Sequence, residues 1–176
     1  MERVQEMPSE AKKKLTIVCQ WFLGKGCTDV EKIALLTYLS DREHLRRYGR
    51  TINRELCRRS GHEILYSLNL RNFKLENRIF DEDELSDTER EVLNLVWDLF
   101  GALDVAQLND IIASFPEFHG TIAMESVLIS RWLVDYPEES KQKMRSYKVK
   151  SDLLELSEAH LKAVRRYLVD VFALPL

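Results

Sequence analysis

Residues 28–52 read TDVEKIALLTYLSDREHLRRYGRTI, and this stretch indicates where the core of the fold lies. Its middle, 33–39, is apolar on nearly every side, as expected of a helix that the rest of a domain surrounds. Thr28 and Glu31 have the spacing of a capping box, which satisfies free backbone N–H groups at a helix start. Gly49 marks a turn after the helix. The stretch therefore predicts a buried helix at the centre of the core.

This helix ends in a charged cluster. Asp41 lies one helical turn before His44, and a carboxylate at that spacing can accept the imidazole N–H, fix its tautomer and raise its pKa. Tyr48 lies one turn beyond His44 and can join the same network. Asp41 and His44 are either a structural contact or the general-base pair of a small enzyme. The structural interpretation is favoured because no nucleophile is identifiable beside them.

Further helices are predicted from capping residues and from apolar residues at three- and four-residue steps. Ser86 and Glu89 form a second capping box, Asp104 is an N-cap, and Gly101 and Pro116 end helices. The helices expected on these grounds cover 9–24, 86–101, 104–116, 122–134 and 157–172. The polar segment 137–150 is either a solvent-exposed helix or a linker.

Strands are expected in the middle of the chain, where the helical period is lost. Residues 51–57 predict a short strand or extended segment, and 63–70 fits neither helix nor strand cleanly. Residues 73–75 and 78–80 predict a small hairpin with a two-residue turn. The predicted fold class is α+β, predominantly α-helical: a single compact domain over 1–176 with a central buried helix and a short β-sheet or hairpin.

Length and composition narrow the class of protein. A chain of 176 residues suits one domain, and its formal net charge of −3 points to neither nucleic acid nor membrane. Cys19, Cys27 and Cys57 have no metal-ligand spacing and predict free thiols in a reducing compartment. Neither a secretory signal nor a membrane span is present, so we expect a cytoplasmic protein. No metal or cofactor is expected.

Charge is distributed unevenly along the chain. Residues 42–59 hold seven arginines and two glutamates, an excess of five positive charges. Residues 76–91 hold eight acidic residues and two arginines, an excess of six negative charges. The two regions are either partner surfaces or solvated faces that partly neutralise each other. Arg46, Arg47 and Arg54, with Arg50, could contact phosphates, but nucleic acid is the less favoured partner because the isoelectric point is about 5.9.

No motif with a clear catalytic mechanism is present: the chain lacks G-x-S-x-G, G-x-x-x-x-G-K-[ST], G-x-G-x-x-G and H-E-x-x-H. His62, His119 and His160 have no companion ligands at metal-like spacing. We therefore assign no catalytic residues, although the absence of these motifs does not exclude an enzyme. The apolar ending 171–176 packs either within the fold or across a homodimer.

Similarity to a known protein family indicates a function for this chain. Asp41-Arg42-x-His44-Leu45, followed by Tyr48-Gly49-Arg50-x-Ile52, resembles the Panacea domain, the SocA-like antitoxin domain of bacterial toxin–antitoxin pairs and phage-associated relatives. The resemblance covers about 32–119 and leaves the C-terminal helices of 120–176 outside it. At 60–64 this chain keeps the family's glycine and lacks its prolines.

The resemblance implies a non-enzymatic protein-binding module that neutralises a co-encoded cognate toxin by direct contact. It also implies a partner-binding or functional cluster: Asp41, Arg42, His44, Tyr48 and Arg50.

Overall fold

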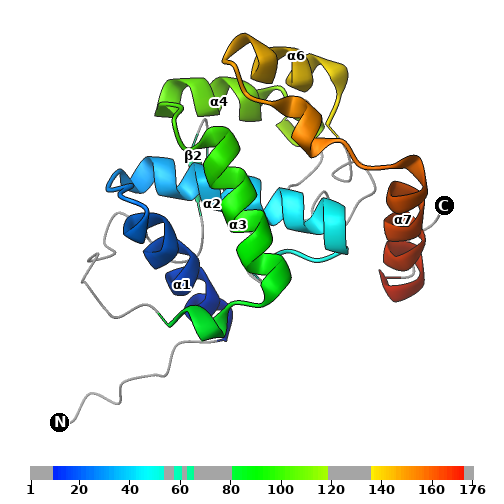
Figure 1. The fold of residues 1–176 in the computed structure, drawn as a ribbon, viewed down its shortest axis with the longest axis horizontal. Coiled ribbons are helices and arrows are strands. Elements are labelled where there is room, and N and C mark those ends of the chain that lie inside the picture. Colours follow the sequence, from blue (N-terminus) through cyan, green and yellow to red (C-terminus); the bar gives the residue numbers. More distant parts are fainter. Residues whose placement is uncertain (1–9, 54–57, 61–62, 66–80, 119–135, 173–176) are drawn as a thin grey trace.

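The computed structural model describes residues 10–53, 58–60, 63–65, 81–118 and 136–172 of the chain. Among these residues, every layer of the fold is made of helices (Figure 1). The α-helices are α1 (Glu10–Gly24), α2 (Val30–Tyr48), α3 (Asp87–Phe100), α4 (Val105–Ala113), α6 (Glu138–Ser146) and α7 (Glu158–Phe172). Short 3₁₀ helices are η2 (Glu82–Glu84), η3 (Pro116–Phe118) and η5 (Ser151–Leu154).

Helix α2 forms the centre of this fold, and α1, α3, α4 and α7 all pack against it (Figure 1). Every residue from 33 to 46 is buried, which confirms the predicted central helix. Its N-cap is Asp29 and not the predicted Thr28: Asp29 Oδ1 accepts the backbone N–H groups of Glu31 and Lys32 at 2.9 and 3.2 Å. A carboxylate also adds favourable charge at the positive end of a helix dipole.

The predicted α+β class is wrong. Residues 51–53 form a bend and not a strand, because the Asp41 carboxylate accepts the Asn53 backbone N–H at 2.8 Å, a donor that a neighbouring strand would otherwise use. Strands β1 (Arg58–Ser60) and β2 (Glu63–Leu65) pair antiparallel over three residues each, which is too short to add a layer to the fold. The hairpin predicted over 73–80 lies outside the described residues.

Helix α3 crosses α2 and begins with the predicted capping box (Figure 1). Ser86 Oγ accepts the Glu89 backbone N–H at 3.3 Å, and Glu89 Oε2 accepts the Ser86 backbone N–H at 2.9 Å. The helix ends at Gly101, as predicted. The Gly101 carbonyl accepts a hydrogen bond from Lys32 Nζ at 2.7 Å, which ties the end of α3 to the start of α2.

Helices α4 and α6 lie together along one side of the body (Figure 1). Asp104 caps α4, as predicted, by accepting the Gln107 backbone N–H at 2.8 Å. Ser114 Oγ, just after α4, donates to Ser140 Oγ of α6 at 2.8 Å. Segment 137–150 thus contains a helix, whereas the helix predicted over 122–134 lies outside the described residues.

The predicted C-terminal helix is confirmed as α7, which packs against the end of α2. Cys19 and Cys27 are buried free thiols, as expected of small core side chains, and Cys57 lies outside the described residues. In the part of the chain that the structure describes, no helix has both the length and the apolar character to cross a membrane.

Candidate functional site at the C-terminal end of helix α2

Asp41 anchors the chain that follows α2. Its carboxylate is buried and accepts the Asn53 backbone N–H at 2.8 Å. The Asn53 side-chain amide donates to both carboxylate oxygens, at 3.2 and 3.1 Å. These three hydrogen bonds between Asn53 and Asp41 hold segment 49–53 against α2. The role that the geometry gives Asp41 is therefore that of a loop anchor.

His44 is buried, and each of its ring nitrogens has a partner. Nδ1 lies 2.7 Å from the Arg50 carbonyl oxygen and must donate to it, so the Nε2 of a neutral ring accepts from Thr88 Oγ1 at 3.1 Å. The expected Asp41–His44 N–H contact is therefore replaced by these two bonds. Burial lowers the pKa of His44, and although the Arg50 carbonyl opposes this, the net shift is downward and opposite to the predicted rise.

Arg42 is buried, and its guanidinium group lies between an acidic side chain and two aromatic rings. Its Nε donates to Glu117 Oε1 of η3 at 3.0 Å, and Tyr38 donates to the same oxygen. Its guanidinium carbon lies over the rings of Phe115 and Tyr136, 4.2 and 4.3 Å from their centroids. Burial alone would lower the pKa of Arg42, but Glu117, Tyr136 and Tyr38 together outweigh it and the pKa is raised. Arg42 therefore joins α2 to the segment after α4.

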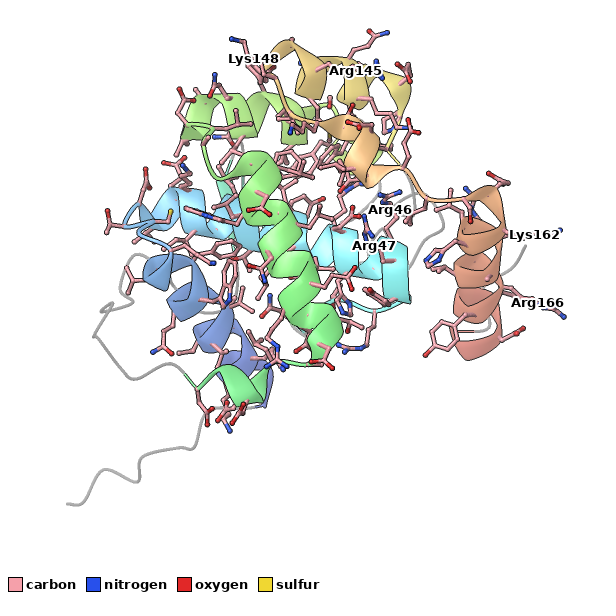
Figure 2. All side chains as sticks on the ribbon, viewed as in Figure 1. Arg46, Arg47, Arg145, Lys148, Lys162 and Arg166 are labelled. Carbon is pink, nitrogen blue, oxygen red and sulfur yellow. The ribbon has the colours of Figure 1, made fainter. Side chains whose placement is uncertain are left out.

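Two of the arginines predicted to contact phosphates, Arg46 and Arg47, share the acidic partner Glu43 inside the fold. Arg46 has a side chain 1 % exposed and donates to both oxygens of Glu43, at 3.1 and 3.0 Å, and to the Leu154 carbonyl. Arg47, 16 % exposed, donates to Glu43 Oε1 at 2.6 Å. Burial raises the pKa of Glu43, but both arginines outweigh this and the net pKa is lowered. Figure 2 labels Arg46 and Arg47 between α2 and the segment that leads to α7.

Tyr48 and Arg50 are the accessible members of the cluster that the resemblance implies. We call these five residues the α2-end cluster: Asp41, Arg42, His44, Tyr48 and Arg50. The Tyr48 hydroxyl donates to Glu91 Oε2 of α3 at 2.8 Å, and its ring lies 4.9 Å from that of His44. Arg50, with a side chain 46 % exposed, donates to Glu89 Oε1 at 3.0 Å. The cluster is thus divided: Asp41, Arg42 and His44 lie inside the fold, and Tyr48 and Arg50 reach its surface. Arg54 lies outside the described residues.

The two regions of opposite charge meet between the end of α2 and the first turns of α3. Arg50 pairs with Glu89, and Arg47 lies 3.9 Å from Glu91. Glu89 also accepts from Lys14 of α1 at 2.9 Å. The described part of the arginine-rich region is therefore partly neutralised by the acidic region across the fold, as one of the two interpretations expected.

Sequence reasoning missed the buried acids and the tyrosine that complete these networks. Glu117 and Tyr136 contact α2 from positions 75 and 93 residues further along the chain, so no local pattern reveals them. Glu43 gave a usable signal, because arginines follow it three and four residues later on the same helix face. Glu89 was recognised as a capping residue but not as the partner of Arg50 and Lys14.

Among the described residues, no group of three or more histidine, cysteine, aspartate or glutamate side chains is placed to hold a metal ion. Comparison with protein-family models, with curated proteins and with solved structures finds no match to this chain. The resemblance to the Panacea domain therefore stays a prediction from the sequence.

Proposed function

We propose that this chain is a non-enzymatic protein-binding module that acts in the cytoplasm as an antitoxin, neutralising a co-encoded toxin by direct contact. The proposal starts from the resemblance of residues 41–52 to the SocA-like antitoxin domain, and it includes both bacterial and phage origins. Its partner is the cognate toxin, and no cofactor takes part.

The observation that carries the proposal is how the fold uses the polar residues of the α2-end cluster. A general base must reach the proton that it removes, and His44 is buried with both ring nitrogens bonded within the fold. Asp41 holds Asn53, and Arg42 holds Glu117. Asp41, Arg42 and His44 are residue types that catalysis could use, but each is bonded within the fold and holds the end of α2 in place. This supports a protein that functions through contacts at its surface.

That surface presents side chains suited to protein binding. Tyr48 is partly exposed and Arg50 is exposed, and Glu91 of α3 lies beside them. Tyrosine and arginine contribute most often to the free energy of protein–protein binding, because they combine a large contact area with directed hydrogen bonds. Since α2 and α3 hold both residues in place, little conformational entropy is lost when a partner binds.

The test is co-expression of the tagged chain with the adjacent gene of its native genome, followed by purification and a growth assay. We expect a complex of equal stoichiometry and rescue from the toxicity of the neighbouring product. The double variant Tyr48→Ala with Arg50→Ala should weaken the complex. Arg145→Ala on α6 with Tyr147→Ala at the C-cap of α6 is the matched control, because it also removes one exposed arginine and one partly exposed tyrosine.

Two outcomes would overturn the proposal. In one, the chain co-purifies with no protein and gives no protection against the neighbouring gene product. In the other, it carries nucleic acid that high salt removes, which would favour DNA binding because phosphate contacts weaken steeply with salt.

A further inference from the structure

The fold brings a hydroxyl group to His44 that no local sequence pattern places there. Thr88, the second residue of α3, lies 44 residues further along the chain, and its Oγ1 is 3.1 Å from His44 Nε2. Because His44 Nδ1 donates to the Arg50 carbonyl, Nε2 of the neutral ring is an acceptor, and the Thr88 hydroxyl donates to it. The proton of the Thr88 hydroxyl is therefore directed at the basic nitrogen of His44.

The Ser86 hydroxyl extends this chain of hydrogen bonds to the surface. Ser86 Oγ lies 3.2 Å from Thr88 Oγ1, and since the Thr88 proton is directed at His44, Ser86 is the donor in this bond. Ser86 is exposed and Thr88 is partly exposed, whereas His44 is buried. Thr88 Oγ1 uses one of its two lone pairs to accept from Ser86, so its other lone pair remains for a reagent that approaches from solvent.

This arrangement has the parts of an activated nucleophile. A hydroxyl group is a weak nucleophile until a neighbouring base takes its proton, and the base works best when a third group orients it. Thr88 supplies the hydroxyl, His44 supplies the base, and the Arg50 carbonyl holds the imidazole in the required tautomer. His44 is too deeply buried to reach a proton outside the fold, but it reaches this one.

The start of α3 supplies donors for the negative charge that develops on a carbonyl oxygen under attack. The backbone N–H groups of Asp87 and Thr88 belong to the first helical turn, which has no intrahelical acceptors. Neither N–H has an acceptor in the part of the chain that the structure describes. The helix dipole also favours negative charge at this end. These donors add to the nucleophile and its base, and the three together suit acyl transfer.

An uncharged acyl group fits this site better than a phosphoryl group does. Phosphoryl transfer spreads negative charge over several oxygens and is assisted by cations placed around them. Arg50, whose carbonyl orients His44, already has its guanidinium paired with Glu89 at 3.0 Å. Attack on an acyl carbonyl places charge on a single oxygen, which one or two N–H groups can bind.

We propose that Thr88 is an acylation site, at which the hydroxyl activated by His44 takes the acyl group of an activated ester or thioester. The bond from Thr88 Oγ1 to the acyl carbon forms, and the bond from that carbon to the leaving oxygen or sulfur breaks. The Thr88 proton passes to His44 Nε2 and then to the leaving group, which returns His44 to its neutral form. The product is one acyl ester per chain, so the inference goes beyond the proposed function and requires no catalytic cycle.

The test uses p-nitrophenyl acetate, an uncharged activated ester with a coloured leaving group, on the purified full chain at neutral pH. Peptide mass spectrometry locates the acetyl groups, and hydroxylamine, which cleaves esters and leaves amides intact, distinguishes acetylated hydroxyls from acetylated lysines. Thr28 is the internal control: it is an exposed threonine next to the N-cap of α2, and no histidine is bonded to it among the described residues. Circular dichroism and thermal unfolding establish that each variant is folded.

We expect Thr88 to be acetylated at least about tenfold faster than Thr28, because a positioned general base accelerates attack by its partner. His44→Gln keeps an N–H donor for the Arg50 carbonyl but supplies no base, so it should slow acetylation of Thr88 to about the rate of Thr28. Thr88→Ser keeps the hydroxyl and should still be acetylated at that position, whereas Thr88→Val should not.

Three results would overturn the inference: equal rates at Thr88 and Thr28, undiminished labelling of Thr88 in a folded His44→Gln variant, or acetylation of Ser86 in place of Thr88. The comparison of Thr88 with Thr28 is made within the wild-type protein, so it stands even if a variant does not fold. All measurements use the chain alone, and they are therefore independent of whether a toxin partner is found.

Discussion

A Cβ atom built on Gly49 would lie 2.7 Å from Cδ1 of the Tyr167 ring, so the end of α2 and the side of α7 meet where only glycine fits. Gly49 also has a φ of 75°, the left-handed conformation in which its N–H bonds to the Leu45 carbonyl at 2.9 Å. Gly49 therefore ends the central helix α2 and leaves the space against which Tyr167 of α7 packs. A methyl group at this position should disturb both the end of α2 and the packing of α7.

Gly49→Ala should destabilise the protein by about 1–2 kcal/mol from the left-handed backbone alone. Displacement of the Tyr167 ring adds to this cost and loosens α7. Urea denaturation measures the first effect, and faster proteolysis of the connection between η5 and α7 measures the second.

Gly24→Ala is the matched control for this substitution. A Cβ there meets no atom within 4 Å, so we expect a change within about 1 kcal/mol in either direction. Equal stability of the two alanine variants would contradict the role assigned to Gly49.

Arg42→Leu should cost about 3–5 kcal/mol, because it leaves the buried Glu117 carboxylate without its guanidinium partner. Adding Glu117→Leu removes the uncompensated charge, so the double variant should be more stable than Arg42→Leu alone. The free energies of unfolding of the two single variants and the double variant form a double-mutant cycle. Strictly additive effects would show that the Arg42–Glu117 pair has no coupling.

The sequence was informative where the determinants are local. The apolar run of α2 predicted a central helix, and Ser86 and Asp104 predicted two helix starts, because helical period and capping depend on residues within one turn. It was uninformative about which charges are buried. Nothing in the sequence near Arg42 distinguishes it from a solvent-exposed arginine. Its buried environment is formed by distant residues, Phe115, Glu117 and Tyr136.

The wrong fold class has a physical origin of the same kind. Residues after Gly49 lose the helical period, and loss of that period fits a strand as well as a loop. The choice is made by Asp41, whose carboxylate takes the Asn53 backbone N–H and holds this segment against α2. The Asp41 side chain, twelve residues earlier, thus accepts the hydrogen bond that a neighbouring strand would otherwise accept.

Asp41→Ala should release that segment. Loss of the acceptor leaves the Asn53 backbone N–H and side-chain amide in a buried position, at a cost of about 1–3 kcal/mol. Hydrogen exchange at the Asn53 amide should accelerate more than exchange at amides in the middle of α3. Unchanged protection at Asn53 would mean that the carboxylate does not hold the segment.

His44 predicts how stability depends on pH. Burial holds the pKa of His44 below its ordinary value of 6.5, so the unfolded chain binds a proton on this ring more readily than the folded protein does. Stability is then fully present above pH 6.5 and falls as the pH drops through 6.5 towards the lower folded pKa. Glu43 and Glu89 also have lowered pKa values, but their contribution is lost only below their ordinary value of 4.5.

Thermal unfolding at pH about 7.5 and about 5.5 separates the contribution of histidine from that of the glutamates. Histidine titrates between these two pH values, whereas the glutamates stay ionised. The wild-type melting temperature should be lower at the acidic pH. His44→Gln keeps an N–H donor for the Arg50 carbonyl but does not titrate, so its melting temperature should change less over the same interval, from a lower starting value. An equal acid-induced drop in both proteins would show that protonation of His44 does not oppose folding, and that the ring is not held neutral between Arg50 and Thr88.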